Sequence, residues 1–265
     1  MLRAVIVGAA GRMGQALIRA SAARTDLRIG AAISSAGSKV LGRDAGEVAG
    51  AARLGVPVTD DLAAALPECD VAIDFSHATA TAASLAACVA AGRPLLIGTT
   101  GLRADAGQEL ERAARHIALL VAPNTSLGVT VLLELVRQCA RALPRHFDVE
   151  ILESHHRLKK DAPSGTALAL GHVVAEARGQ ALEEVGVRGR AGPEVPRREG
   201  EIGFAVLRGG DVVGEHTVIF AGAGEQLSLT HRATDRSIFA RGALDAAVWL
   251  ASRPPGRYAM RDILL

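Results

Sequence analysis

One feature constrains this sequence more than any other: an apolar strand that runs through a glycine-rich turn into a helix. Residues 4–7 form a continuous apolar run, as expected of a strand that is buried in a parallel sheet. Gly8, Gly11 and Gly14 follow at once, and apolar residues then recur at helical spacing from residue 16 to residue 20. The chain is therefore predicted to begin with the first β-α unit of an α/β fold.

The alternation of strand and helix continues to about residue 122. Further strands are predicted at residues 28–33, 71–75, 94–97 and 118–121, with helices at 78–91 and 104–116. Such alternation is typical of a parallel sheet with helices on both faces. We therefore expect a Rossmann-like, dinucleotide-binding α/β domain.

The glycine-rich turn is a candidate site for a dinucleotide. Its spacing is G-x-x-G-x-x-G rather than G-x-G-x-x-G, but it lies between a first strand and a first helix. That place lets the backbone approach a pyrophosphate at the helix N-terminus, while a plain tight turn is the alternative interpretation. The residues assigned to the cofactor here are Gly8, Ala9, Ala10, Gly11, Arg12 and Met13.

The end of the second strand predicts which dinucleotide binds. An NAD site usually carries Asp or Glu about twenty residues after the last glycine, to accept hydrogen bonds from the ribose. Ser34 and Ser35 stand there instead, with Lys39 and Arg12 as nearby cations, although Lys39 is on a glycine-containing loop and is alternatively only solvated. This end suits a 2′-phosphate, so NADPH is predicted as the preferred cofactor, with NADH as the second choice.

Loops after later strands complete the predicted cofactor site, because ligands of open α/β sheets bind beyond the carboxyl ends of the strands. One such loop begins at Asp74, and the other two contain further cofactor candidates, although any loop can contain such residues. The family resemblance described below is what assigns these candidates to the cofactor. These residues are Gly98, Thr99, Thr100, Ala122, Pro123, Asn124 and Thr125.

The character of the sequence changes after Ser126. A helix is predicted at residues 129–143, a strand leading to a sheet edge at 149–152, and antiparallel strands at 202–207, 215–220 and 226–231. Residues 186–200 are rich in Gly, Pro and Arg and are predicted to form a mobile or partner-facing loop.

These patterns divide the chain into two domains. Residues 237–250 return to helical periodicity and are expected to pack on the first domain. The dinucleotide-binding domain is therefore expected to comprise residues 1–126 and 236–265. Residues 127–235 are expected to form an α+β substrate-binding domain with an open mixed sheet.

A basic stretch from His155 to Thr166 is the candidate small-molecule site, since it joins a strand to a helix. Asp161 or Ser164 can cap the start of that helix. The backbone N–H groups of Ser164, Gly165 and Thr166 are expected to point outward unpaired, where the helix dipole favours a carboxylate. A solvated basic loop before a well-capped helix is the alternative interpretation.

The same stretch contains groups that exchange protons near neutral pH. Lys159 and Lys160 are two of only three lysines, against 27 arginines. Arginine does not release its proton near neutrality, whereas lysine and histidine can be tuned to do so. A site that donates a proton therefore needs residues such as His155, His156 and Lys159.

Composition excludes several other classes of protein. A chain of 265 residues with 49% hydrophobic residues can bury a substantial core, and a net charge of +2 is too small to imply binding to nucleic acid or membrane. The N-terminal apolar run is too short for a signal peptide, so a cytoplasmic protein is expected.

No metal site is predicted, because His155 and His156 would point to opposite faces of a strand and no third ligand has suitable spacing.

Several motifs together resemble the 4-hydroxy-tetrahydrodipicolinate reductase family, also called dihydrodipicolinate reductases. They span essentially the whole chain: G-x-x-G-R-M-G, D-F-S, G-T-T-G, A-P-N-T-S, E-S-H-H-R-L-K-K-D-A-P-S-G-T-A and G-E-H-T. The combination of H-H-x-x-K with D-A-P-S-G-T is the most specific of them.

The resemblance implies NAD(P)H-dependent reduction of a cyclic dicarboxylate, 4-hydroxy-tetrahydrodipicolinate, in diaminopimelate and lysine synthesis. It assigns proton handling to His155 and Lys159, and substrate binding to His156, Ser164, Gly165 and Thr166. It also implies a homotetramer that associates through the sheet of the second domain. Members of this family often use both NADH and NADPH, but they carry an acidic-basic pair where this chain has Ser34 and Ser35.

Two other functions stay open at this point. Another two-domain NADPH oxidoreductase, acting on an amino-acid-like dicarboxylate, would share the glycine-rich turn and the carboxylate clamp. A non-catalytic redox sensor would bind the nucleotide without needing His155 or Lys159. Either of these two residues is a candidate proton donor.

Overall fold

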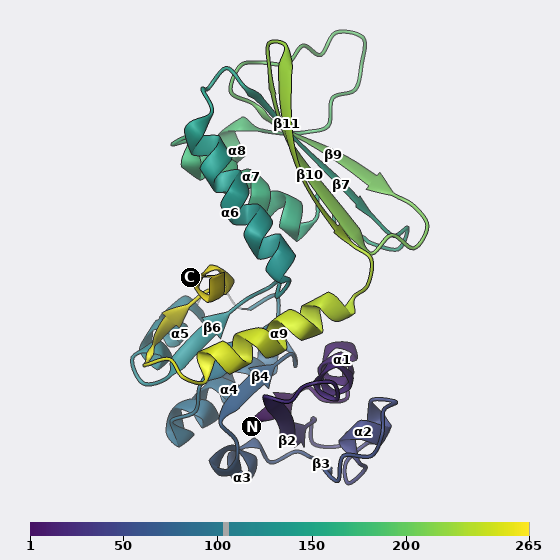
Figure 1. Cartoon of the computed structure of the whole chain (residues 1–265), viewed down its shortest axis with the longest axis vertical. Helices are drawn as coiled ribbons and strands as arrows, with labels where there is room; N and C mark the ends of the chain where they lie inside the picture. Colours follow the sequence, from purple (N-terminus) through teal and green to yellow (C-terminus); the bar gives the residue numbers. More distant parts are fainter. Residues whose placement is uncertain (103–105, 265) are drawn as a thin grey trace. The chain divides into compact units, whose positions relative to one another are not determined.

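The chain folds into two compact units. The computed structural model describes residues 1–102 and 106–264 (Figure 1). Unit 1 comprises Met1–Leu127 and Ser237–Leu265, and unit 2 comprises Gly128–Arg236. The domain boundaries expected from the sequence lie one residue before these.

Unit 1 is built on a seven-stranded sheet with the order β12-β6-β5-β4-β1-β2-β3, in which all neighbouring strands are parallel. The strands are β1 (Leu2–Val7), β2 (Leu27–Ile33), β3 (Val58–Thr59), β4 (Val71–Asp74), β5 (Leu95–Ile97), β6 (Ala118–Val121) and β12 (Gly256–Tyr258). The expected Rossmann-like sheet is confirmed. Strands β3 and β12 were not predicted, because β3 has only two residues and β12, with the sequence Gly-Arg-Tyr, contains no apolar run.

Helices cover both faces of this sheet, because alternate strand residues join different apolar clusters. Ala4 and Ile6 of β1 pack in the cluster of α1 and α9, and Val5 and Val7 in that of α4 and α5. The helices of unit 1 are α1 (Arg12–Ser21), α2 (Ala45–Val48), α3 (Leu62–Ala65), α4 (Ala78–Ala91), α5 (Ala106–Ala114) and α9 (Ser237–Leu250), with 3-10 turns η1 (Leu66–Glu68) and η2 (Met260–Leu264). Of the helix predicted at 104–116, residues 104 and 105 lie outside the described part.

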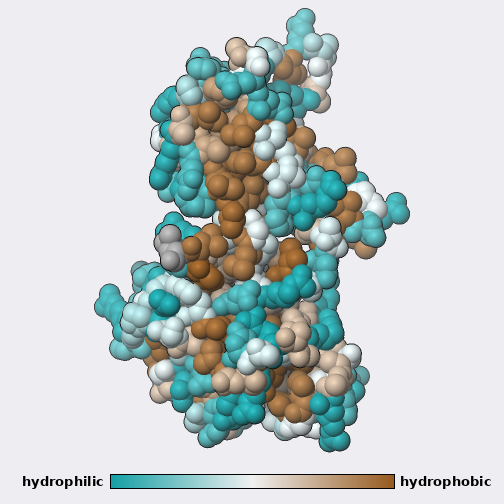
Figure 2. Space-filling view, in the orientation of Figure 1, coloured by the Kyte–Doolittle hydropathy of each residue, from teal (hydrophilic) through white to brown (hydrophobic). Residues whose placement is uncertain are grey.

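Unit 2 has a mixed five-stranded sheet with the order β11-β10-β7-β9-β8. Its elements are α6 (Leu127–Ala142), β7 (Asp148–His155), α7 (Gly165–Ala177), α8 (Leu182–Val185), β8 (Gly186–Arg188), β9 (Ile202–Arg208), β10 (Gly214–Gly222) and β11 (Glu225–Ala233). Helices α6 and α7 pack on the face that carries Val149 and Ile151. Apolar side chains also reach the surface along α6 (Figure 2), and they include Val131 and Leu135.

Three predictions about unit 2 were wrong. Strand β7 does not end at residue 152 but continues to His155, and this end was missed because the buried polar Glu153 and His155 interrupt the apolar pattern. Strand β9 is parallel to β7 rather than antiparallel, because helix α7 provides the crossover that a parallel pair needs. The predicted loop at 186–200 begins with strand β8, and ion pairs of its Arg190 and Arg197 with Glu150 tie the remainder to β7.

The three cysteines are free thiols.

Within residues 1–102 and 106–264, every helix is too short or too polar to cross a lipid bilayer.

Gly242 on α9 provides a test of how this helix is packed in unit 1. A Cβ atom at Gly242 would lie 1.9 Å from the carbonyl oxygen of Thr125, whose hydroxyl donates to the carbonyl of Phe239 at 2.7 Å. Gly242→Ala is therefore expected to lower the free energy of unfolding by about 1–3 kcal/mol, through overpacking. Denaturation in urea measures this change.

Gly107 on α5 is the matched control, because no described atom lies within 4 Å of the corresponding Cβ position. Gly107→Ala is expected to raise stability by up to about 1 kcal/mol, through helix propensity. Equal stability of Gly242→Ala and the parent protein would contradict this packing.

Candidate active site

The predicted cofactor residues line one edge of the parallel sheet. Strands β2, β1, β4, β5 and β6 are consecutive in the sheet, so the loops after their carboxyl ends follow one another along that edge. The loops begin in the same order at Ser34, Gly8, Phe75, Gly98 and Ala122. This is the edge at which open α/β sheets bind ligands.

The glycine-rich turn is packed closely against its neighbours. Gly8 has a φ of +85°, and a Cβ there would lie 2.7 Å from the carbonyl oxygen of Phe75. A Cβ at Gly14 would lie 2.3 Å from the carbonyl oxygen of Gly8. Helix α1 starts directly after Gly11, which has no side chain to cap the first N–H groups. These N–H groups suit a pyrophosphate, because the first turn of a helix has no intrahelical acceptors for them.

Two threonines assigned to the cofactor use their hydroxyl groups within the protein. The hydroxyl of Thr99 lies 3.3 Å from both the carbonyl and the carboxylate of Asp74, and that of Thr125 donates to the carbonyl of Phe239. The backbone N–H of Gly98 also donates to the carbonyl of Asp74, at 2.9 Å. These hydroxyls hold the loops in place, which leaves mainly backbone groups and the exposed Thr100 for a ligand.

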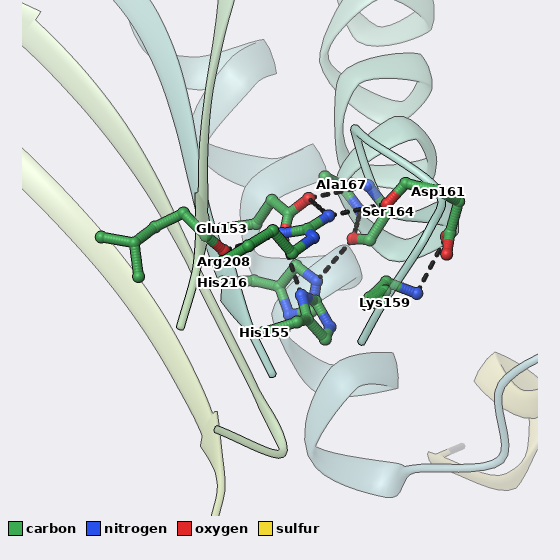
Figure 3. Close-up of polar contacts among 9 residues, drawn as sticks. Glu153, His155, Lys159, Asp161, Ser164, Ala167, Arg208 and His216 are labelled. Atoms are coloured by element: carbon green, nitrogen blue, oxygen red, sulfur yellow. Dashed lines mark hydrogen bonds and ion pairs between the residues drawn. The ribbon is translucent and has the colours of Figure 1, made fainter. Parts of the chain in front are cut away.

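A second group of polar residues converges in unit 2, where α7 begins (Figure 3). Glu153 and His155 are two residues apart on β7 and therefore share its inward face. His216 of β10 pairs with Glu153, and Arg208 of β9 pairs with His155. Strand register thus brings together side chains that are far apart in the sequence.

Glu153 is the centre of this group and is only 3% exposed. Its Oε2 lies 2.6 Å from Nδ1 of His155, and its Oε1 accepts the backbone N–H of Ser164 at 2.9 Å. Both terminal nitrogens of Arg208 donate to the carboxylate at 2.7 Å. Burial raises the pKa of Glu153, but the bonds from Arg208, His155 and Ser164 outweigh burial and hold this pKa below its usual range.

The start of α7 differs in one respect from the prediction. Ser164 caps the helix, because its Oγ accepts the N–H of Ala167 at 3.2 Å, whereas Asp161 forms an ion pair with Lys159 at 2.8 Å. The N–H of Ser164 was expected to be unpaired, which was wrong, because Glu153 occupies it. Gly165 is exposed, and no described atom lies within 4 Å of its Cβ position, so a ligand can approach this turn.

Burial disfavours the charged form of both buried histidines. Burial lowers the pKa of His155, with Glu153 acting in the opposite direction. Burial also lowers the pKa of His216, to about 4, and its Nε2 lies 3.0 Å from Oγ of Ser164. The rings of the two histidines lie 5.1 Å apart in a T-shaped arrangement. A Cβ at Gly214 would lie 3.0 Å from Nε2 of His155, so glycine there leaves that edge of the ring uncrowded.

The six predicted substrate residues all lie on the segment from the end of β7 to the first turn of α7. The structure joins His155 and Ser164 through Glu153, and it places the half-buried His156 and Lys159 on the connecting loop. Glu153, Arg208 and His216 were not predicted as site residues. The pattern Glu153-x-His155 in a strand was the available signal for the first, because alternate strand residues share a face.

Models of one protein family match both parts of this chain. The family described as "Dihydrodipicolinate reductase, N-terminus" matches residues 2–125, and "Dihydrodipicolinate reductase, C-terminus" matches residues 128–264. The 4-hydroxy-tetrahydrodipicolinate reductase of Anaeromyxobacter dehalogenans is 50% identical over 264 residues, which cover 100% of this chain and 98% of that protein. The protein of the same name from Alkalilimnicola ehrlichii is 52% identical over 262 residues, covering 99% and 98%.

A solved structure with the same fold is described as dipicolinate-bound dihydrodipicolinate reductase from Paenisporosarcina sp. TG-14. It has a TM-score of 0.77 at 22% sequence identity, and the match covers 98% of this chain and 97% of that chain. Since the two family matches together cover nearly all of residues 2–264, the chain belongs to the dihydrodipicolinate reductase family.

Proposed function

We propose that the chain reduces 4-hydroxy-tetrahydrodipicolinate to tetrahydrodipicolinate, with NADPH as the hydride donor, in diaminopimelate and lysine synthesis. The observation that carries this proposal is the junction of β7 and α7, where proton-exchanging side chains stand next to an approachable helix N-terminus. Relatives that are about 50% identical over nearly their whole length are named for the same reaction. The cytoplasmic location expected from the sequence stays a prediction.

The start of α7 is suited to one carboxylate of the substrate. The first turn at Gly165 and Thr166 carries N–H groups and the positive end of the helix dipole, which together favour an anion. Lys159 and His156 on the preceding loop supply further hydrogen-bond donors. The related protein from Paenisporosarcina is described with dipicolinate, a planar ring dicarboxylate, which is the ligand class proposed here.

The edge of the parallel sheet is suited to the dinucleotide. Gly8 to Met13 would receive the pyrophosphate, because the close packing of Gly8 and Gly14 leaves backbone N–H groups rather than side chains at the surface of the turn. Residues 98–100 and 122–125 would line the remainder of the site. When bound, NADPH supplies the hydride.

Replacing the 4-hydroxyl of the substrate by hydrogen consumes one hydride and one proton and releases water. We assign the proton to Lys159, because an ammonium group carries one at neutral pH. His155 is less suited to donate, since its pKa is lowered by burial and its Nδ1 is bonded to Glu153. Asp161, which pairs with Lys159 in this structure, would give way to the substrate carboxylate.

The direct test of the function is a coupled assay. The purified chain is mixed with freshly generated 4-hydroxy-tetrahydrodipicolinate, and the loss of reduced nicotinamide is followed by absorbance. Turnover with this substrate, and not with other amino-acid-like dicarboxylic acids, is expected. Preference for another dicarboxylate, or binding of NADPH without turnover, would overturn the proposal.

Lys159→Arg tests the proton donor. Arginine keeps the positive charge but does not release a proton near neutrality, so kcat is expected to fall on the order of 10²- to 10⁴-fold. The Kd for dipicolinate, measured by calorimetry, should change only slightly. Lys160→Arg, at the exposed neighbouring position, is the control and should retain the parent kcat. A kcat of Lys159→Arg close to that of the parent would show that Lys159 is only an electrostatic anchor.

Ser34→Asp tests the cofactor preference. Ser34 directly follows β2, at the place where NAD-specific sites carry a carboxylate. The new charge would repel a 2′-phosphate, so the ratio of kcat/KM for NADPH to kcat/KM for NADH is expected to fall more than about 10-fold. The parent protein should favour NADPH. Comparable kcat/KM values for the two cofactors in the parent protein would refute this preference.

We also propose that the chain assembles as a homotetramer through the outer face of the sheet in unit 2. Leu152 and Leu207 lie on the face opposite Glu153 and His155, and they are 40% and 58% exposed. An apolar sheet face open to this extent favours burial against another copy. Combining Leu152→Lys with Leu207→Lys should give a smaller species in analytical ultracentrifugation, whereas Leu54→Lys in unit 1 should not. A tetramer that survives the double substitution would place the interface elsewhere.

A further inference from the structure

We propose that Glu153 is a positioning residue, which fixes His155 as the Nδ1–H tautomer and holds the first turn of α7 through the backbone of Ser164. This inference deepens the proposed function and rests on it. It concerns a side chain for which the sequence motifs suggested no role, and which touches neither of the two ligands proposed above.

The hydrogen bonds of Glu153 determine which atom carries the hydrogen between Glu153 and His155. Oε1 of Glu153 faces the N–H of Ser164 and one nitrogen of Arg208, and Oε2 faces Nδ1 of His155 and the other nitrogen of Arg208. A backbone N–H and a guanidinium only donate, so both carboxylate oxygens must accept. Nδ1 of His155 must then carry the hydrogen, and the 2.6 Å distance is typical of a strong bond to a charged acceptor.

The consequence for His155 is that Nε2 of the neutral ring becomes an acceptor. Gly214 leaves space beside this atom, since a Cβ there would lie only 3.0 Å away. The groups that face the ring from the surrounding elements are Glu153 on β7, Lys159 on the loop, Arg208 on β9 and His216 on β10. His155 is thus set to accept a hydrogen bond from substrate or water, while the ammonium of Lys159 supplies the proton.

The consequence for α7 is that the carboxylate clamp and the histidine share one support. The oxygen of Glu153 that binds Ser164 belongs to the same rigid carboxylate that orients His155. Arg208 also donates to the carbonyl of Asp161 at 2.7 Å, which ties the connecting loop to the same pair. A shift of Glu153 would therefore move the helix start and the ring together.

Glu153→Gln is the decisive variant, because it keeps the size of the side chain and removes one acceptor. Beside Ser164 the new NH₂ group would meet two fixed donors, the N–H of Ser164 and one nitrogen of Arg208. Beside His155 it would meet one fixed donor, the other nitrogen of Arg208, and Nδ1 of His155, which can accept if its hydrogen moves to Nε2. The NH₂ group is therefore expected to face His155. The tautomer of His155 is therefore expected to invert, and kcat to fall on the order of 10²-fold, as for a misplaced acid-base group.

The tautomer is read from ¹⁵N chemical shifts of labelled histidines, above the pKa of His155, with a His155→Asn sample for assignment. The parent protein should show a protonated Nδ1 and a bare Nε2, and Glu153→Gln the reverse. Glu153→Asp keeps both acceptors and should restore the parent tautomer. Glu150→Gln is the matched control, because Glu150 is on the same strand with two arginine partners but on the opposite face. It should alter neither tautomer nor kcat.

A bare Nδ1 in the parent protein would overturn the inference, even if Glu153→Gln does not fold. An unchanged tautomer in Glu153→Gln would do the same. The two proposals fail separately, since the spectra need no turnover. A parent protein with the expected tautomer that does not reduce 4-hydroxy-tetrahydrodipicolinate would overturn the function and leave the assignment of the hydrogen intact.

Discussion

A buried carboxylate that must be neutralised on every side organises unit 2. An unpaired ion inside a protein costs several kcal/mol, so the charge of Glu153 requires donors from several elements at once. Strand β9 contributes Arg208, β7 contributes His155, and the start of α7 contributes the N–H of Ser164. These bonds fix the registers of two strands relative to a helix. They also place the residues of the proposed substrate site, because that site is the segment which joins β7 to α7.

In unit 1 the loops at the edge of the sheet are held in place by close packing rather than by a buried charge. The edge proposed to bind the cofactor depends on close packing that glycines permit, against backbone atoms at Gly8 and Gly14 and against the ring of Phe75 at Gly98. The hydroxyl groups of the loop residues Thr99 and Thr125 donate hydrogen bonds to backbone carbonyls of the protein. In the proposed function the two units therefore have different tasks: unit 1 would present backbone N–H groups to a dinucleotide, and unit 2 would present side chains to an anionic ring. A two-substrate reductase needs both kinds of surface.

Local sequence patterns predicted most of this fold and part of the site. Apolar runs located the longer strands of both units but not the short β3, β8 and β12. The turn after β1 and the basic stretch predicted the two ligand regions proposed above. The pairing of β9 was missed, because alternation of apolar residues does not distinguish parallel from antiparallel neighbours. Arg208 and His216 were missed because they lie 55 and 63 positions from Glu153 and meet it only through strand register. The error about the N–H of Ser164 has the same origin, since its acceptor lies 11 residues earlier in the chain.

Both carboxylate oxygens of Glu153 are proposed to act only as hydrogen-bond acceptors, so that Nδ1 of His155 carries the hydrogen between the two side chains. Neutron diffraction from a deuterated crystal tests this most directly, because it locates the deuterons themselves, at a pD above the pKa of His155. We expect a deuteron on Nδ1 of His155 directed at Glu153, none on Nε2, and none on either oxygen of Glu153. A deuteron on Nε2 with a bare Nδ1, or a protonated Glu153, would contradict it.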